Sequence, residues 1–447
     1  MKRNDLTQGA LLPHMLAFAV PYLIACFLQS FYGMADLFIT GWFNGAAPVT
    51  AVSIGSQVTH FLTIVTIGLV MGCTISISRS LGGKRMKEVS VYIGNTISLF
   101  TVFAFLFTTI LFLSLDAILS LLATPLEALE DTQHYLRICF AGYPFIIAYN
   151  VLAGIFRGLG DTKTPMYCVS VAGIINIVLD YILIGPFANG ASGAAWATVC
   201  SQAIAFCLAF FCLLRKDMGF TLTKKDFAPD LYQIRQILYI GLPISCQDGC
   251  IQVSFLVITA IANSKGIDVA AAVGIVEKII GFLFLVPSAM LSTVSTIAAQ
   301  NAGAGLHQRS REAMYYGMGI CLVFGCLCIL FTEYQAEWMV SLFVANEPEV
   351  VRLGGQYLSS YVFDVPLAAI HFCFSGYFCA YKKSMYSFFH NMASIVLVRV
   401  PGTYLMALLF PATLYPMGLA SPAGSLLSIL ICIILYRWKF GKSVTSN

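Results

Sequence analysis

The chain has 447 residues, of which 59% are hydrophobic and only 10% are charged, and its net charge is +4. A soluble domain usually has about 25% charged residues, so this composition, with a mean hydropathy of +0.83, excludes a soluble fold and indicates an integral membrane protein. So small a net charge does not suggest nucleic acid, and we expect no nucleic-acid partner.

Twelve apolar segments follow one another along the chain. The first begins after a basic stretch, MKRNDLTQG, without a small-residue cleavage site, so we interpret it as a membrane helix and not as a signal peptide. The segments are residues 12–40, 47–78, 91–115, 132–156, 165–187, 191–213, 232–261, 269–300, 313–332, 353–380, 385–410 and 416–436. Each can cross about 30 Å of hydrocarbon at 1.5 Å per residue. The sequence therefore predicts an all-α polytopic membrane protein.

The basic residues predict how these helices are oriented. If the N-terminus is cytoplasmic, only Arg137, Lys265 and Arg352 fall in outer segments. The inner segments hold Lys2, Arg3, Arg79, Lys84, Arg85, Lys87, Arg157, Lys163, Arg215, Lys216, Lys224, Lys225, Arg235, Arg309, Arg311, Lys382, Lys383, Arg437, Lys439 and Lys442. This asymmetry is the positive-inside rule for an even number of spans, with both termini cytoplasmic.

The two halves of the chain resemble each other. Matching residues recur 221 or 222 positions apart: Pro21 with Pro243, Gly82 with Gly303, Tyr135 with Tyr357, Pro144 with Pro366, and Gly154 with Gly376. Six helices per half make the repeats parallel, about an axis along the membrane normal, as in transporters that rock two bundles around a central site. We expect an N-lobe at 1–221 and a C-lobe at 222–447, joined by the charged linker from Arg215 to Arg235.

Two aspartates in the first half lie inside apolar segments. An acid at the bilayer centre costs at least about 2.5 kcal/mol, so each needs a partner or a function. Asp180 and Asn176 share a helix face. Asp180 precedes, and Thr198 follows, the turn near residue 189 by nine residues, and Asp36 lies at a comparable depth. Two carboxylates, an amide and a hydroxyl at one level can bind a monovalent cation or share protons. The alternative is polar contacts that only tie helices together.

Pro21 lies fifteen residues before Asp36 in the same predicted helix. A proline removes one backbone hydrogen bond and creates a point where a helix can bend. Inert proline kinks are also common in membrane helices. The sequence thus leaves two alternatives for Pro21, a gating bend and a static kink.

The second half has its own charges in apolar segments: Asp248, Asp364 and Arg399, with Glu277 beside Lys278. One interpretation is a buried ion pair in which Asp364 or Asp248 neutralises Arg399. The other is a second titrating site, since Asp364 and His371 are seven residues apart and share a face. Glu277 and Lys278 point to different faces, and we interpret them as structural or cavity-lining.

Known enzyme and cofactor motifs are lacking. Gly82-Gly83-Lys84 is without the spacing of a phosphate-binding loop, and no HExxH or GxSxG motif occurs. The fifteen cysteines fall in apolar stretches without a CxxC pair, which disfavours a disulfide scaffold or structural zinc. We expect neither an enzyme nor a cofactor.

Several motifs together resemble the multidrug and toxic compound extrusion (MATE) family of cation-coupled antiporters. They are Pro21 with Tyr32-Gly33-Met34-Ala35-Asp36, Gly72 with Gly82-Gly83, Phe156 to Pro165 (FRGLGDTKTP), Asn176-Ile177-Val178-Leu179-Asp180, and Gly193-Ala194-Ala195-Trp196-Ala197-Thr198. The likeness covers nearly the whole chain.

The resemblance implies a V-shaped pair of six-helix lobes in the cytoplasmic membrane that exports lipophilic, often cationic drug-like compounds against inward H⁺ or Na⁺. The chain looks like the bacterial branch with a coupling site in the N-lobe, where Asp36, Asn176, Asp180 and Thr198 would bind H⁺ or Na⁺ and Pro21 would bend. We expect a monomer. The alternative is a lipid-linked oligosaccharide flippase of the same superfamily, which should have a more basic cavity than this chain.

Overall fold

The structure, a computed structural model, describes residues 5–344 and 346–440. Among these residues it contains helices and no strand, and twelve of its helical spans are long and apolar enough to cross a membrane. The spans begin and end within several residues of the predicted segments, which confirms the all-α, twelve-helix prediction. Lys2, Arg3 and Lys442, which contributed to the predicted orientation, lie outside the described residues.

The helices form two compact units. The first comprises Leu16–Ser245 with the described residues before Gly9, and the second Gly9–Met15 with the chain from Cys246. Up to the linker the helices are α1 (Leu11–Phe43), α2 (Ala46–Gly82), α3 (Met86–Leu113), α4 (Leu115–Leu121), α5 (Leu126–Gly158), α6 (Lys163–Ile184) and α7 (Gly190–Arg215). After it come η1 (Lys224–Phe227), α8 (Leu231–Asn263), α9 (Ile267–Leu283), α10 (Leu285–Gly303), α11 (His307–Ser341), α12 (Pro348–Tyr361), α13 (Asp364–Ala380), α14 (Ser384–Ser394), η2 (Ile395–Arg399), α15 (Val400–Leu409), α16 (Tyr415–Gly418) and α17 (Ala420–Phe440).

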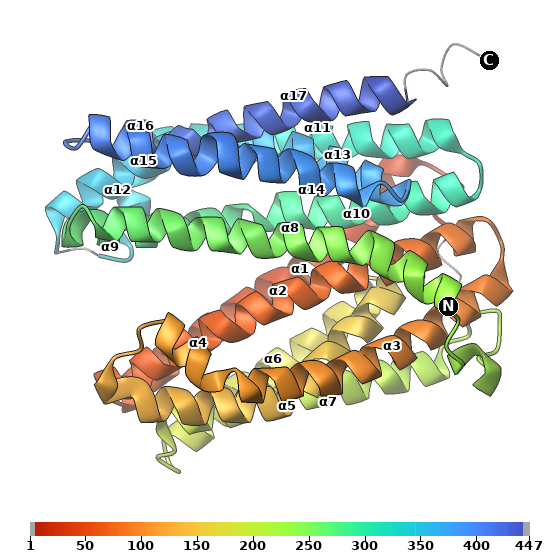
Figure 1. The fold of residues 1–447 in the computed structure, drawn as a ribbon, viewed down its shortest axis with the longest axis horizontal. Helices are drawn as coiled ribbons and strands as arrows, with labels where there is room; N and C mark the ends of the chain where they lie inside the picture. The colour runs from red at the N-terminus through yellow and green to blue at the C-terminus, as the bar shows by residue number, and fades with distance from the viewer. Residues whose placement is uncertain (1–4, 345, 441–447) are drawn as a thin grey trace. The chain divides into compact units, whose positions relative to one another are not determined.

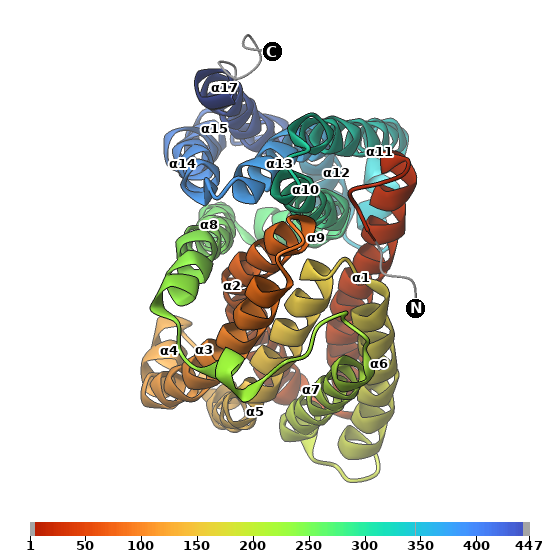
Figure 2. The same cartoon turned by 90° about the vertical axis from the view of Figure 1, so that its right-hand side faces the viewer.

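Helix α5 is the centre of the first unit, packed along α2, α3 and α7 (Figures 1 and 2). Small residues allow this close packing: a Cβ added to Gly154 would lie 2.2 Å from Val70 Cγ1. The hydroxyls of Thr74 and Ser78 in α2 donate to the carbonyls of Gly154 and Gly158, at 2.9 and 3.0 Å. Small residues and interhelical hydrogen bonds stabilise helix pairs in a membrane, where lipid is as apolar as the side chains.

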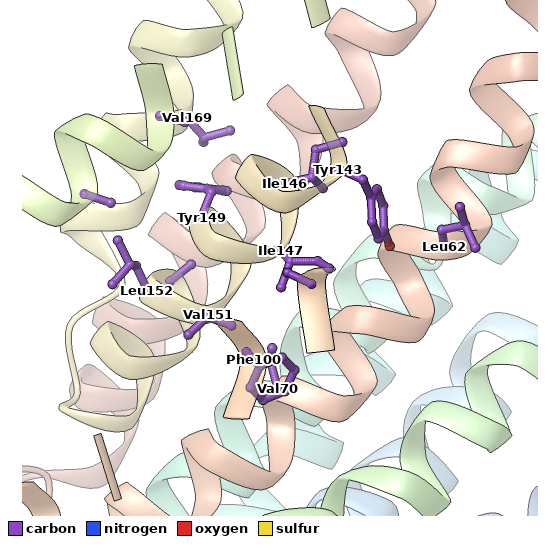
Figure 3. Packing of buried hydrophobic residues seen from close by; sticks show 14 of the residues in the cluster. Leu62, Val70, Phe100, Tyr143, Ile146, Ile147, Tyr149, Val151, Leu152 and Val169 are labelled. Carbon is purple, nitrogen blue, oxygen red and sulfur yellow. The ribbon is translucent and has the colours of Figure 1, made fainter. Parts of the chain in front are cut away.

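Figure 3 shows the apolar core of this unit around α5. The side chain of Tyr143 extends from α5 toward α2 near Leu62, and its hydroxyl lies 2.9 Å from the Thr66 hydroxyl. Because a buried phenol needs a hydrogen-bond partner, this contact fixes the relative register of the two helices.

The first half of α8 also belongs to the first unit and packs against α2. A Cβ on Gly72 would lie 2.1 Å from the carbonyl oxygen of Ile237, and one on Gly241 would lie 2.4 Å from that of Leu69. The Ser245 hydroxyl donates to the Val65 carbonyl at 2.8 Å. This unit therefore extends past residues 221 and 222, the predicted boundary between the repeats. The predicted boundary marks where the sequence repeats, whereas the packed unit ends later, at Ser245.

The second unit repeats the central packing of the first. Its α10 and α13 pack as α2 and α5 do, with α11 and α17 against α13. A Cβ on Gly376 would lie 2.7 Å from the Leu291 carbonyl oxygen and 3.2 Å from the Ser295 nitrogen. Gly376 and Ser295 lie 222 and 221 residues after Gly154 and Thr74, so the same close contact recurs at the predicted offset.

Prolines interrupt three spans of the second unit. One break separates α9 from α10 at Phe284, and a second separates α12 from α13 at Val362–Phe363. The third is the π-helical turn η2, which lies between α14 and α15. Pro287, Pro366 and Pro401 lie at or just after these breaks. A proline has no N–H to donate to the carbonyl four residues earlier, so the regular helix is lost there. By contrast, Pro21, Pro144 and Pro243 lie within continuous helices.

Candidate functional site

Asp36 lies in a buried polar site formed by α1, α6 and α7. Its side chain is 3% exposed, and the Thr198 hydroxyl of α7 donates to its Oδ2 at 3.1 Å. Asp180 and Asn176 of α6 also interact with the Asp36 carboxyl and have no exposed surface. The structure thus brings together the four residues whose common depth was predicted from the sequence.

This site has more acceptors than donors. Although Asp180 and Asn176 lie beside the Asp36 carboxyl, Oδ1 of Asp36, both carboxylate oxygens of Asp180 and both side-chain polar atoms of Asn176 are buried without a partner in good hydrogen-bond geometry. Throughout the described ranges, no lysine, arginine or histidine forms an ion pair with either aspartate. Two adjacent carboxylates repel each other when both are ionised, and burial strengthens the repulsion. A bound proton or small cation would remove it.

The oxygen atoms suit a monovalent cation better than a transition metal. Carboxylate, amide and hydroxyl oxygens are hard ligands. In the part of the chain that the structure describes, no group of three or more His, Cys, Asp and Glu residues is placed to hold a metal ion. The predicted Na⁺ ligands include only two acids, so Asn176 and Thr198 would supply further oxygens.

A second group of side chains surrounds the site and was missed by the sequence analysis. Gln202 of α7 donates to the Tyr32 hydroxyl of α1 at 2.8 Å. Tyr135 of α5 lies near both aspartates and is 1% exposed. Tyr32 and Gln202 each lie four residues from a predicted site residue, Asp36 and Thr198, so helical spacing was the available signal.

The α6–α7 hairpin holds its part of the site in register. Its turn reaches Gly190, whose φ of +51° lies in the left-handed region. A Cβ on Gly193 would lie 3.1 Å from the Leu183 backbone. Because only glycine accepts both the turn and the close approach at low cost, the two helices run back together from the turn. That geometry brings Asp180 and Thr198 to the same level.

Pro21, the predicted bending point, lies inside α1, which is one helix from Leu11 to Phe43. It lies about four turns before Asp36 on this helix. The structure therefore places the proline and the acid on one element, and the predicted bending itself stays a prediction.

In the second unit, the predicted pairing of Arg399 with an acid is not a direct contact, although Asp364 interacts with Arg399 electrostatically. Among the described residues, neither Asp364 nor Asp248 lies within ion-pair distance of Arg399. Arg399 donates to the Tyr361 hydroxyl and lies 4.8 Å from the centroid of the Phe255 ring. Asp248 instead interacts with Gln247.

Asp364 has two further sources of stabilisation, the first of which arises because the helix is broken beside it. The break at Val362–Phe363 puts Asp364 in the first turn of α13, where the helix dipole favours a negative charge. Its Oδ1 accepts a hydrogen bond from Ser425 of α17.

A buried polar chain continues from Ser425. The Ser425 hydroxyl lies 3.3 Å from His371 Nε2, the rings of His371 and His390 are 5.4 Å apart, and His390 Nε2 lies 2.8 Å from the Ser375 hydroxyl. Asp364 and His371, which were predicted to share a helix face, are thus connected by the Ser425 hydroxyl. Whether this chain titrates stays a prediction.

Glu277 and Lys278 point to different sides of α9, as the sequence predicts. Glu277 is partly buried and accepts a hydrogen bond from Thr259 at 3.0 Å, while Lys278 is exposed. Glu277 therefore has a structural partner in α8.

The loop between α5 and α6 is organised by Asp161. Its Oδ1 accepts from the backbone amides of Lys163 and Thr164, each at 3.0 Å, and its Oδ2 accepts from the Thr164 hydroxyl and from Lys216. Burial alone would raise the pKa of Asp161, but Lys216 and these hydrogen bonds outweigh it and hold the pKa below its usual range. The carboxylate therefore stabilises the loop in its ionised form.

Asp161→Asn is expected to lower the unfolding temperature of the purified chain at pH 7 and to flatten its fall in acid. The ionised carboxylate contributes stability above its unfolded pKa of about 4, and that contribution is lost as the pH falls through the lower folded value. Thermal unfolding between pH 7 and pH 3 tests this, with the exposed Asp217→Asn as control. Equal pH profiles for all three proteins would contradict it.

Comparisons with known proteins agree with this architecture. The MatE family profile matches residues 21–182 and again 243–405, in the two halves of the chain. The chain is 27% identical over 443 residues to the probable multidrug resistance protein YpnP of Bacillus subtilis, covering 99% of this chain and 98% of that protein. It is 26% identical to an FAD transporter of Shewanella oneidensis, covering 94% and 95%. A solved outward-facing multidrug resistance MATE transporter has the same fold, with a TM-score of 0.92 at 20% identity, covering 100% and 99%.

Proposed function

The chain belongs to the MatE family of membrane transporters, and from this premise we propose that it is a secondary active antiporter. It exports lipophilic, cationic compounds across the cytoplasmic membrane in exchange for H⁺ or Na⁺ by alternating access. Both termini lie in the cytoplasm, as the distribution of basic residues favours. The multidrug resistance and export proteins among its relatives support efflux as the activity.

The observation that carries the coupling proposal is the Asp36–Asp180 pair, buried without a basic partner among the described residues. Such a pair does not stabilise the fold, because each buried charge raises the free-energy cost of ionising the other. The cost falls when H⁺ or Na⁺ occupies the site, with Asn176 and Thr198 completing the set of ligands. Ion occupancy therefore changes the free energy of packing α1, α6 and α7 together around the site.

Coupling requires that the two arrangements of the transporter bind the ion with different affinities. An ion that bound both equally would shift no equilibrium. In the proposed mechanism, occupancy neutralises the site, α1 bends at Pro21, and the reshaped first unit releases the exported compound outward. Release of the ion to the cytoplasm restores the charged site.

Pro21→Ala is expected to leave the chain folded but to reduce export several-fold. Alanine restores the missing backbone hydrogen bond and stiffens α1 at the proposed bend. Efflux rates at matched expression measure the effect. The matched control is Pro243→Ala, the equivalent proline in α8. Equal losses for the two variants, or none for Pro21→Ala, would leave the static kink as the explanation.

Dye efflux from a pump-deficient bacterial host tests the function and identifies the ion. Cells expressing the chain should expel a lipophilic cationic dye faster than cells with an empty vector. An uncoupler that collapses the proton gradient should stop the efflux if H⁺ is the coupling ion, and removal of sodium should stop it if Na⁺ is. Efflux that survives both treatments would contradict the proposed antiport.

The FAD transporter among the relatives suggests a second substrate class to include in this assay, flavin dinucleotides. Selective export of flavin without dye efflux would replace the cationic-drug proposal while keeping the ion-coupled mechanism.

A further inference from the structure

A buried arginine outside the acidic site has no counter-charge among the residues that the structure describes. Arg157 lies in the last turn of α5 and is only 7% exposed, with its guanidinium carbon 5.1 Å from the centroid of the Tyr22 ring in α1. An arginine keeps its positive charge in proteins and carries five N–H donors. A buried charge is costly unless it is paired and hydrogen-bonded.

The described part of the chain places no acid against this charge. Among the described residues, no carboxylate lies within ion-pair distance of Arg157. The carboxylate closest in sequence, that of Asp161, is occupied by Lys216, Thr164 and backbone amides. The Tyr22 ring offsets part of the charge through a cation–π contact, but it covers only one face of the guanidinium.

A small cavity adjoins the guanidinium. It has a volume of about 30 Å³. Its polar lining comes from Arg157 and Asn150 of α5, from Tyr22, Cys26 and Gln29 of α1, and from Thr162, and apolar side chains line much of the rest. Its lining also supplies amide donors. One N–H of the Asn150 amide donates to the Ile146 carbonyl at 2.8 Å, which leaves its second N–H for the cavity. The volume exceeds the 10–15 Å³ or so that one water requires, which is room for a single small ion.

We propose that this cavity is a binding site for one small monovalent inorganic anion, chloride, which serves as the counter-ion of Arg157. The guanidinium and the amides of Asn150 and Gln29 donate to the anion, and the size of the cavity excludes larger anions. This site lies in the first unit but is separate from the acidic site, so the proposal does not depend on ion-coupled export.

Anion binding would also join α1 to α5. Tyr22, Cys26 and Gln29 follow one another at helical spacing on one face of α1, directly after Pro21. An anion held between this face and Arg157 stabilises the contact of α1 with α5, and its loss leaves the guanidinium without a counter-charge. The folded chain should therefore gain stability from chloride by mass action.

Thermal unfolding of the purified full-length chain in detergent tests the proposal. At constant ionic strength, chloride and bromide should raise the unfolding temperature in a saturable way by several degrees, whereas gluconate should not. An unfolding temperature that is the same in all three salts would overturn the proposal, because water and the helix end would then suffice to stabilise Arg157.

Variants separate the site from a general salt effect. Arg157→Gln should abolish the difference between chloride and gluconate, while Arg137→Gln, at an exposed arginine of the same helix, should retain it. If Arg157→Gln does not fold, Gln29→Leu, which removes one amide donor, should raise the chloride concentration for half-maximal effect about tenfold. An unchanged chloride response in Arg157→Gln, or in Gln29→Leu where that variant is needed, would assign the effect to another site.

Discussion

Asp36→Asn and Asp180→Asn are each expected to abolish ion-driven export while the chain still folds and inserts. An asparagine keeps the shape of the side chain and can still accept from the Thr198 hydroxyl, but it cannot carry the charge whose neutralisation drives the change. Replacing one of two adjacent buried carboxylates also removes their repulsion, so stability should be equal or higher. Efflux rates at matched membrane expression, with thermal unfolding of the purified variants, measure both effects.

The control for these variants is Asp116→Asn, at an exposed aspartate of α4 in the same unit, which should export at the native rate. Asp364→Asn serves as the comparison from the second unit, where a helix terminus and Ser425 already stabilise the acid. Native efflux by both Asp36→Asn and Asp180→Asn, with loss in Asp364→Asn, would move the coupling site to the second unit.

Gly72→Leu is expected to prevent stable folding of the first unit. The added side chain would begin with a Cβ only 2.1 Å from the Ile237 carbonyl oxygen and 2.9 Å from the Gly241 nitrogen. These are backbone atoms of α8 and cannot rotate away, so α2 and α8 would have to separate. Overpacking of a close-packed core typically costs 1–3 kcal/mol, and a clash with backbone belongs at or above the upper end of about 3 kcal/mol. Expression and the unfolding temperature measure the loss.

Gly319→Leu is the matched control, because it makes the same substitution inside a helix where a Cβ would meet nothing within 4 Å. Leucine has a higher helix propensity than glycine, so this variant should be as stable as the native chain or more so. Gly72→Ala should give an intermediate loss. Native stability of Gly72→Leu would show that the α2–α8 contact is not required in the folded protein.

The positions of the membrane helices could be predicted from the sequence because each span must satisfy its own backbone and be apolar throughout. The depth of the acidic site could be predicted for the same reason. Counting equal numbers of residues from the α6–α7 turn put Asp180 and Thr198 at one level, and both do interact with Asp36. Because a regular helix rises by a fixed distance per residue, the number of residues from a turn gives the depth of a side chain in the membrane.

Contacts between helices do not follow from spacing along one helix. Tyr135 of α5 interacts electrostatically with both aspartates, and the first half of α8 packs against α2, because of which helix faces meet in the bundle. Spacing along one chain does not determine such contacts. A duplicated sequence helped only where both copies keep the same small residue, as Gly154 and Gly376 do.

The predicted pairing of Arg399 with Asp364 is not a direct contact among the described residues, for a related reason. A continuous helix was assumed through Asp364, and an acid in its middle would need a base. Pro366 breaks that helix and turns Asp364 into a first-turn residue of α13, stabilised by the helix end and by Ser425. Pro366 was visible in the sequence, but the equivalent Pro144 lies in an unbroken helix, so the proline alone did not decide the outcome.

The most direct test of the central claim is a flux measurement on the purified chain in proteoliposomes. An outward-directed gradient of a lipophilic cationic dye, with no ion gradient, should drive H⁺ or Na⁺ in the opposite direction, detected by an internal pH indicator or by ²²Na⁺. We predict that this counterflow occurs with the native chain and is absent in the Asp36→Asn variant. Dye movement without ion movement, or equal ion movement in the variant, would contradict the proposal that Asp36 and Asp180 bind the coupling ion.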